Sequence, residues 1–309
     1  MKWKNFVDAI NLFKTYGLNP SLLRIYYHFT YHYIRKLNPL WKFLYNRRYG
    51  RGSEVMHEDW DVLILLDALR FDVFRDFHEL DGQLNSITCL GAGSWEFMCE
   101  NFVGHQFHDT VYLTANPFSE RLEANIFFNQ ISVLDKWDED IGTVHPSTMV
   151  DAARKAALKY PNKRLIIHMM QPHDPHLGRL KHEIYEKISR ENNVNKFMFK
   201  ACKMGAISRQ ELIHSYIQNF SLVQNYVSSL VESVDGKIVI SADHGENLGE
   251  KKFGVRIWEH SIHTRECREI PWFVIKSDQR RQIIEERPQL NSRFDETVIN
   301  QRLAELGYV

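Results

Sequence analysis

The stretch KIVISADHGENLGE, residues 237–250, is a short apolar run that ends abruptly in ionisable residues. Its apolar part has the composition of a strand that is buried on both faces of a parallel sheet. Asp243, His244 and Glu246 follow directly, and such groups repel or compete unless a positive charge lies among them. A divalent cation is the simplest such charge. The stretch therefore predicts a strand that delivers metal ligands at its end.

Other segments repeat this design of an apolar run followed by polar residues. WDVLILLDALRFD (60–72) leads to Asp67, and RLIIHMMQPHDPH (164–176) leads to histidines and prolines. A fourth apolar run, EIPWFVI (269–275), is also predicted to be a strand.

Helical patterns fill the gaps between these runs. Residues 208–234 begin with the capping box SRQE, and residues 147–160 form another helical pattern that a proline stops. Strands that alternate with helices indicate an α/β fold. We expect a three-layer sandwich with a mainly parallel central sheet.

The polar residues that follow the predicted strands form the first candidate site. Functional groups collect at the carboxyl ends of strands in such sheets, where Asp67, His173 and the pair Asp243-His244 are expected. Asp67 could instead cap a following helix. A cap does not explain the imidazole beside Asp243, and Gly245 indicates a backbone that needs room or a positive φ. Carboxylates with imidazole suit zinc, manganese or magnesium.

Further histidines are candidates for substrate or metal contacts. Prolines hold the segment QPHDPH extended and rigid, which would aim His173 and His176 at a substrate, and the alternative is an exposed loop. The segment WEHSIHTRE supplies His260 and His263. The chain has 15 histidines, so most of them must serve ordinary structural purposes.

A nucleophile is predicted in CLGAGSWEFM, residues 89–98. Small residues lead to Ser94, which is expected at the start of a helix, where backbone N–H groups attract an anion. Ser94 could also be only the N-cap of that helix. The sequence contains no Gly-x-Ser-x-Gly elbow here, no phosphate-binding P-loop and no GxGxxG motif, so those enzyme classes are unsupported.

These segments together resemble the alkaline phosphatase and sulfatase superfamily, in particular its short sulfatase-like prokaryotic members. The matching pieces occur in family order over about residues 60–309 and are VLILLDALRFDVF, GAGSWEFMCENF, MQPHDPH, YIQNFSLVQNYVSSLVESVDGKIVISADHGENLGE, EHSIHTRECREIPWFV and RLAELGY. The resemblance implies a metal site at Asp67, Asp243, His244 and His260. It also implies Ser94 as the nucleophile and His173 as a residue that faces the substrate's anion.

The sequence also departs from the family pattern. It lacks the Cys-x-Pro-x-Arg sequence, so maturation to formylglycine and true arylsulfatase activity are not supported. The Asp-x-x-x-His pair of two-zinc phosphatases is missing at residues 170–180. The sequence therefore leaves open whether the site binds one metal ion or two. The expected cofactor is therefore a divalent metal, either Zn, Mn, Mg or Ca.

The function implied by this resemblance is metal-dependent hydrolysis of phosphate or sulfate esters through a serine nucleophile and a covalent intermediate. The expected substrate is an anionic ester, and a link to a glycan or lipid would fit it. One alternative is a phosphotransferase that moves a glycerol-phosphate or phosphoethanolamine type group onto a glycan or lipid. Another is a non-catalytic member of the fold that binds an anion or a glycan.

The N-terminal part has a different composition from the rest. Residues 1–57 are predicted to be a basic, aromatic-rich helical segment, followed by the catalytic domain at residues 58–309. Residues 1–51 contain ten Lys or Arg and one acid, which gives a net charge near +9. The net charge of the remaining residues is near −9. Such a segment can contact a membrane surface peripherally. The alternative is that it docks on the acidic remainder, and a nucleic-acid partner is not expected.

The expected localisation is cytoplasmic. Peripheral attachment to the inner face of the membrane is the alternative. The four cysteines form no CxxC pair, which favours reduced thiols. The first residues lack a long apolar region with a small-residue cleavage site, and no stretch approaches the roughly 18 apolar residues of a membrane span.

Overall fold

The computed structural model describes residues 33–180, 183–184, 186, 198–203, 205–252, 255–277, 279–291 and 293–308. A seven-stranded sheet forms its centre, in the order β2-β9-β6-β1-β5-β3-β4. The strands are β1 Val62–Leu66, β2 Gln83–Thr88, β3 Phe107–Thr114, β4 Phe127–Ser132, β5 Arg164–Met169, β6 Ile238–Ser241 and β9 Glu269–Ile275. Strand β9 runs antiparallel to both of its neighbours, and the other pairs are parallel.

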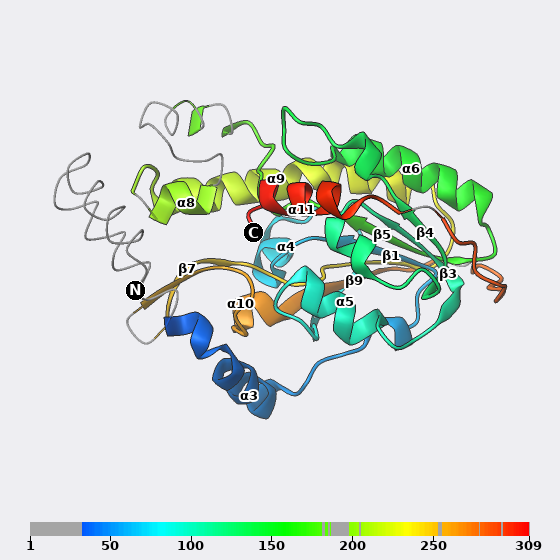
Figure 1. Cartoon of the computed structure of the whole chain (residues 1–309), viewed down its shortest axis with the longest axis horizontal. Coiled ribbons are helices and arrows are strands. Elements are labelled where there is room, and N and C mark those ends of the chain that lie inside the picture. The colour runs from blue at the N-terminus through cyan, green and yellow to red at the C-terminus, as the bar shows by residue number, and fades with distance from the viewer. Residues whose placement is uncertain are drawn as a thin grey trace.

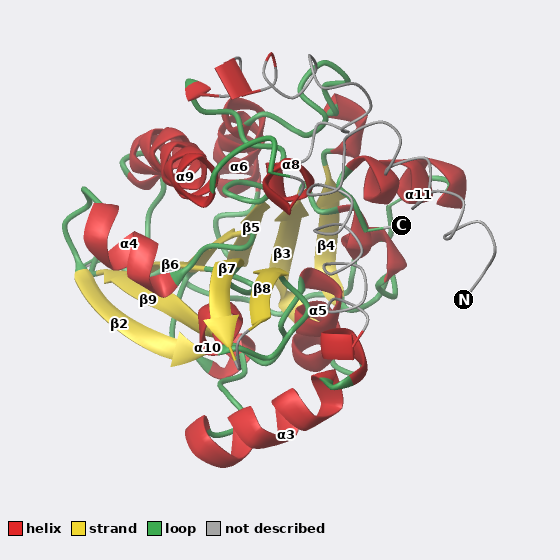
Figure 2. Cartoon of the chain, turned by 90° about the vertical axis from the view of Figure 1, so that its left-hand side faces the viewer, coloured by secondary structure: helices red, strands yellow, loops and turns green. Residues whose placement is uncertain are grey.

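Helices cover both faces of this sheet, as Figures 1 and 2 show. They are α3 Asn38–Tyr49, α4 Phe71–Phe77, α5 Ser94–Phe102, α6 Pro146–Lys159, α8 Met198–Lys203, α9 Arg209–Val231, α10 Arg265–Arg268 and α11 Glu296–Glu305. Short 3-10 turns are η1 Val55–His57, η2 Pro117–Arg121 and η3 Leu134–Lys136, and β7 Asn247–Lys252 pairs with β8 Val255–Glu259 in a separate hairpin.

The central strand β1 separates two apolar clusters because successive side chains of a strand point to opposite faces. Ile64 belongs to the cluster that packs against α4, α6 and α9, whereas Leu63 and Leu65 belong to the cluster that packs against α5 and α11. All five residues of β1 are buried. The predicted three-layer α/β sandwich with a mainly parallel sheet is therefore confirmed.

The predicted strands all belong to this sheet as β1, β5, β6 and β9. The helices predicted at residues 147–160 and 208–234 are α6 and α9, and the helix predicted to begin at Ser94 is α5. The capping box at the start of α9 is present, with Ser208 and Glu211 each accepting a backbone N–H of the other. The sequence did not identify β2, β3 and β4. Strand β2 has the sequence QLNSIT, with few apolar residues and no buried residue, because it lies at an edge.

Part of the predicted N-terminal segment, residues 1–32, lies outside the described residues. The boundary predicted at residue 57 stays a prediction. Within the described part of the chain, no helix is both long and apolar enough to span a bilayer.

Candidate active site

Three neighbouring strands deliver the innermost group of the site. Asp67 follows β1, Asp243 follows β6 on one side, and His168 lies near the end of β5 on the other side. One ligand atom from each residue lies within 4.8 Å of the others, and all three residues are fully buried. Among the described residues, Oδ1 of Asp67, Oδ2 of Asp243 and Nε2 of His168 have no hydrogen-bond partner.

His244 and Ser94 complete this group. The Nε2 atom of His244 lies 3.4 Å from Oδ1 of Asp67 and 3.6 Å from Oδ2 of Asp243. Ser94 is the first residue of α5, with Gly93 as the N-cap. Its Oγ lies 3.3 Å from Oδ2 of Asp67 and 3.3 Å from Nε2 of His244. The serine hydroxyl is thus held at a helix N-terminus against a carboxylate and an imidazole.

The backbone around Asp67 holds its carboxylate in place. Ala68 adopts a left-handed conformation with φ of 62°, which a side chain rarely takes without support. Its N–H donates to Oδ1 of Asp243 at 3.2 Å, and its carbonyl accepts from the Tyr216 hydroxyl at 2.6 Å. Asn116 donates to Oδ2 of Asp67 at 2.8 Å. These contacts leave Oδ1 of Asp67 directed at the group of ligand atoms.

Gly245 allows the turn that follows Asp243 and His244. A Cβ at this position would lie 2.1 Å from the carbonyl oxygen of Glu266, so no larger residue fits. The φ of Gly245 is not positive, and the reason for a glycine is the close approach of two backbones.

The pKa values of Asp67, Asp243 and His244 reflect their burial without a compensating positive charge. Burial, together with the charge of Asp243, raises the pKa of Asp67 well above its usual range. Burial would raise the pKa of Asp243 as well, but His244 and His168 lower it below the usual value. Burial lowers the pKa of His244 to about 4. The two carboxylates therefore cannot both be charged cheaply unless a cation joins them.

A divalent cation fits these atoms. Three buried ligand atoms that converge without hydrogen-bond partners, among the residues described, are costly unless something positive satisfies them. The set of carboxylate oxygens and imidazole nitrogens suits zinc or manganese. Nδ1 of His168 lies 2.8 Å from the Tyr112 hydroxyl, so the ring is oriented with Nε2 toward the carboxylates. Asp67, Asp243 and His168 would hold the ion, with His244 beside them.

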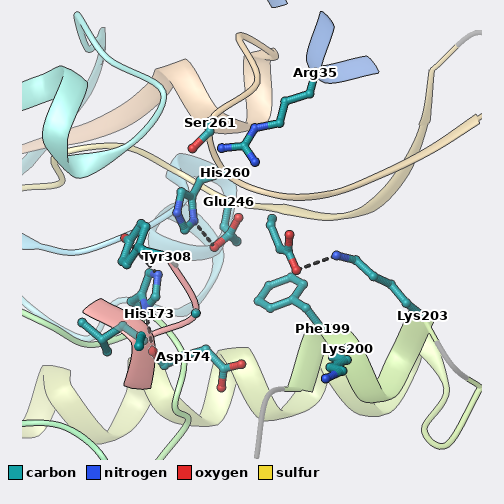
Figure 3. Close-up of a pocket in the computed structure, with 14 residues that line it drawn as sticks. Arg35, His173, Asp174, Phe199, Lys200, Lys203, Glu246, His260, Ser261 and Tyr308 are labelled. Atoms are coloured by element: carbon teal, nitrogen blue, oxygen red, sulfur yellow. Dashed lines mark hydrogen bonds and ion pairs between the residues drawn. The ribbon is translucent and has the colours of Figure 1, made fainter. Parts of the chain in front are cut away.

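A second group lies next to the first and lines a cavity (Figure 3). Nδ1 of His260 lies 3.2 Å from Oε2 of Glu246, and the ring centroids of His260 and His173 are 5.2 Å apart. Tyr308, which follows α11, stacks on His173, and its hydroxyl lies 3.2 Å from Nε2 of that histidine. The rings of His260 and His244 are 4.8 Å apart, so the two groups are in contact.

The cavity has a volume of about 420 Å³ and mixed polar and apolar walls. One end is formed by His173, His260 and Tyr308. Figure 3 shows Lys203 on the far side of the cavity from these residues and the head group of Arg35 beside Ser261. Lys203 is paired with Glu259 at 2.5 Å. A space of this size accepts a small organic ester.

The two cavity histidines differ in their ionisation. Burial favours the neutral form of His260, but the carboxylate of Glu246 outweighs it and raises the pKa of His260. Burial and the neighbouring His260 lower the pKa of His173 well below its usual range. Burial raises the pKa of Glu246. The site thus pairs a histidine that favours the charged form with one that favours the neutral form.

The structure brings most of the predicted site residues together. Asp67, Asp243, His244 and Ser94 form the inner group. His260, predicted as a metal ligand, lies in the second group, where one ligand atom each of His173, Glu246 and His260 lies within 4.8 Å of the others. Its role as a ligand stays a prediction.

His173 lines the cavity, whereas His176 does not. Nδ1 of His176 lies 2.9 Å from the hydroxyl of Ser215 on α9, and its ring packs against Tyr216. His176 thus packs against α9 and does not line the cavity, and its predicted contact with substrate stays a prediction.

Three residues of the site were absent from the predicted set. His168 was taken as part of an apolar strand, although a histidine within a buried run was a usable signal. Glu246 stands in the DHGE stretch, where its position beside Asp243 and His244 was a usable signal. Tyr308 has no local signal, because its contact with His173 joins positions that are far apart in the chain.

The comparisons with known proteins identify no close relative. No family model matches the sequence, and no curated protein does either. Solved structures with a similar fold include the integral membrane protein lipooligosaccharide phosphoethanolamine transferase A from Neisseria meningitidis. It is 11% identical with a TM-score of 0.45, over 69% of this chain and 47% of that chain. This chain thus spans about half the length of that transferase.

Other similar structures come from both transferases and sulfatases. The zinc complex of the periplasmic domain of EptC from Escherichia coli has 11% identity and a TM-score of 0.46, over 74% of this chain and 76% of that chain. A putative sulfatase from Bacteroides thetaiotaomicron has 13% identity and a TM-score of 0.42, over 80% of this chain and 70% of that chain. Both classes are members of the alkaline phosphatase and sulfatase superfamily, the family that the sequence motifs resemble.

Proposed function

We propose that this protein is a metal-dependent hydrolase of phosphate or sulfate esters that uses Ser94 as its nucleophile. One observation carries the proposal. The Ser94 hydroxyl, at the N-terminus of α5, contacts Asp67 and His244 at the edge of a buried set of unsatisfied ligand atoms.

The first step would be attack by Oγ of Ser94 on the phosphorus or sulfur atom. The new O–P or O–S bond forms while the bond to the leaving oxygen breaks, which gives a covalent enzyme intermediate. The hydroxyl proton passes to Oδ2 of Asp67, which already accepts the Ser94 hydrogen bond. A bound divalent cation supplies positive charge that stabilises the ionised serine oxygen and the anionic ester.

The leaving oxygen needs a proton, and His260 is suited to give it. Glu246 keeps its imidazole in the charged form, and the residue lines the cavity. His173 stays neutral and can donate or accept a hydrogen bond to a non-bridging oxygen. Water then attacks the intermediate and gives a proton to the now neutral His260, while the bond to Ser94 breaks. Asp67 returns its proton to Oγ of Ser94, and phosphate or sulfate is released.

The test is metal content by mass spectrometry together with turnover of para-nitrophenyl phosphate and sulfate, as monoesters and diesters. We expect metal in the wild-type protein and turnover of one ester class that Ser94→Ala abolishes. A metal-loaded protein that turns over none of these esters, with or without an added alcohol, would instead support a non-catalytic binding role.

A transferase is a second candidate because the cavity continues past the histidines toward Phe199 and Lys203. That space can hold an alcohol, which would attack the covalent intermediate in place of water. Product analysis with an added alcohol acceptor, such as glycerol or a simple sugar, separates the two reactions. A transferase yields the phosphorylated or sulfated acceptor, and a hydrolase yields inorganic anion alone.

A further inference from the structure

Helix α3 presents large apolar side chains to solvent. Phe43 is 60% exposed, Leu40 is 51% exposed and Leu44 is 48% exposed. These positions are three and four residues apart, so they lie together on one face of the helix. Tyr33, in the helical residues 33–36 before α3, is exposed as well. Figures 1 and 2 place α3 at the periphery of the molecule.

The opposite face of α3 is docked on the body of the protein. Nζ of Lys42 lies 2.6 Å from Oε1 of Glu96 on α5. Asn38 donates to the carbonyl of Ser261 at 2.7 Å. Tyr45 is buried beneath the guanidinium of Arg268, 4.9 Å from its ring centroid. These contacts fix the rotation of the helix, so its apolar face cannot turn inward.

The same region is strongly basic. Residues 33–51 contain six Lys or Arg and no acid. Lys42 and Arg51 pair with acids of α5, while Lys36, Arg47 and Arg48 are exposed. Cations therefore flank the exposed apolar side chains on a helix whose other face is already occupied.

We propose that the exposed face of α3, formed by Leu40, Phe43 and Leu44 with Arg47 and Arg48, is a docking surface for an anionic lipid bilayer. Apolar and aromatic side chains enter the headgroup layer, while Lys and Arg attract anionic headgroups. The absence of any acid from residues 33–51 matches a negatively charged partner. A second copy of the chain fits less well, because two such basic faces would repel each other.

The docking surface is next to the cavity. Arg35 lines the cavity and comes from the helical residues 33–36 that precede α3. Ser261, another cavity residue, is bound by Asn38 of the helix. Contact of α3 with a bilayer would therefore bring the cavity close to lipid-linked esters, a consequence that rests on the proposed function.

The experiment is flotation of the full chain with vesicles of phosphatidylcholine alone and of phosphatidylcholine with phosphatidylglycerol at low salt. We expect binding to the anionic vesicles that salt weakens. The double variant Arg47→Gln/Arg48→Gln should lose about 25-fold in partitioning, since each cation contributes about fivefold. The double variant Phe43→Ser/Leu44→Ser should lose roughly tenfold or more. Leu158→Ser, at an exposed leucine of α6, is the matched control and should bind like the wild type.

Two outcomes would overturn the proposal. One is equal binding by the wild type and both α3 variants, which would place the contact elsewhere. The other is absence of vesicle binding together with dimerisation in sedimentation that Phe43→Ser/Leu44→Ser removes, which would make the face a protein interface. Ser94→Ala should bind vesicles like the wild type, so failure of the proposed catalysis is distinguishable from failure of docking.

Discussion

The hydroxyl of Tyr308 lies 3.2 Å from Nε2 of His173, and the two rings stack with an interplanar angle of 15°. Tyr308 also lines the cavity. It therefore holds His173 in one orientation beside the space where a substrate would lie.

The first prediction concerns this tyrosine. Tyr308→Phe keeps the ring packed on His173 and Phe118 and removes only the hydroxyl. We expect kcat to fall about 3- to 10-fold, the size of one hydrogen bond, with an unchanged melting temperature. Tyr308→Ala should lose more activity and some stability, because the packing is removed as well. Equal activity of Tyr308→Phe and the wild type would show that the hydroxyl has no role.

The second prediction assigns His168 to the metal. His168→Ala removes one of three convergent ligand atoms, so metal content and turnover should fall together. His176→Ala is the matched control, because it also removes a buried histidine but leaves the ligand set intact. Full metal content in His168→Ala would exclude this residue as a major ligand.

A related change acts on His168 indirectly. Tyr112→Phe removes the hydroxyl that orients the imidazole and should weaken metal affinity by about 10- to 100-fold. Titration of metal-stripped protein with zinc measures this affinity independently of turnover. An affinity equal to that of the wild type would mean that the Tyr112 contact is only structural.

The site and the fold were predictable to different degrees. Asp67 and Asp243 could be found because an acid directly after a buried apolar run is a local pattern. His168 could not be assigned in the same way, because its role depends on β5 lying beside β1, and strand order is not local information. Tyr308 depends on a contact between distant segments. The sequence alone does not tell which of His173 and His176 lines the cavity, because the contact of His176 with Ser215 joins segments far apart in the chain.

The third prediction concerns the nucleophile. Ser94→Ala should lower turnover by several orders of magnitude, on the order of 10³-fold or more, because the covalent route is lost. Its fold and metal content should be retained, since Ser94 only borders the ligand atoms. A slow substrate should label Ser94 in the wild type. Labelling of Thr88 or Cys89 would identify a different nucleophile in the same loop, although the buried Cys89 has a pKa raised by burial to about 12 and is a poor one.

The fourth prediction is a pH dependence set by His260 and Glu246. The Glu246 carboxylate overcomes burial and raises the pKa of His260, so the protonated acid persists to a higher pH than for an ordinary histidine. If His260 protonates the leaving oxygen, kcat/KM is retained below this pKa and falls as the pH rises through it. Glu246→Gln removes the charge, and burial then favours the neutral imidazole.

The measurement is the pH profile of kcat/KM for wild type and Glu246→Gln. The alkaline limb of the variant should move to lower pH by about one unit or more, the usual effect of a close opposite charge. Glu286→Gln, at an exposed acid that pairs with Lys163, is the control and should leave the profile unchanged. If the limb does not move in Glu246→Gln, and two ions per chain are found by metal analysis, then His173, Glu246 and His260 bind a second ion and His260 is not the acid.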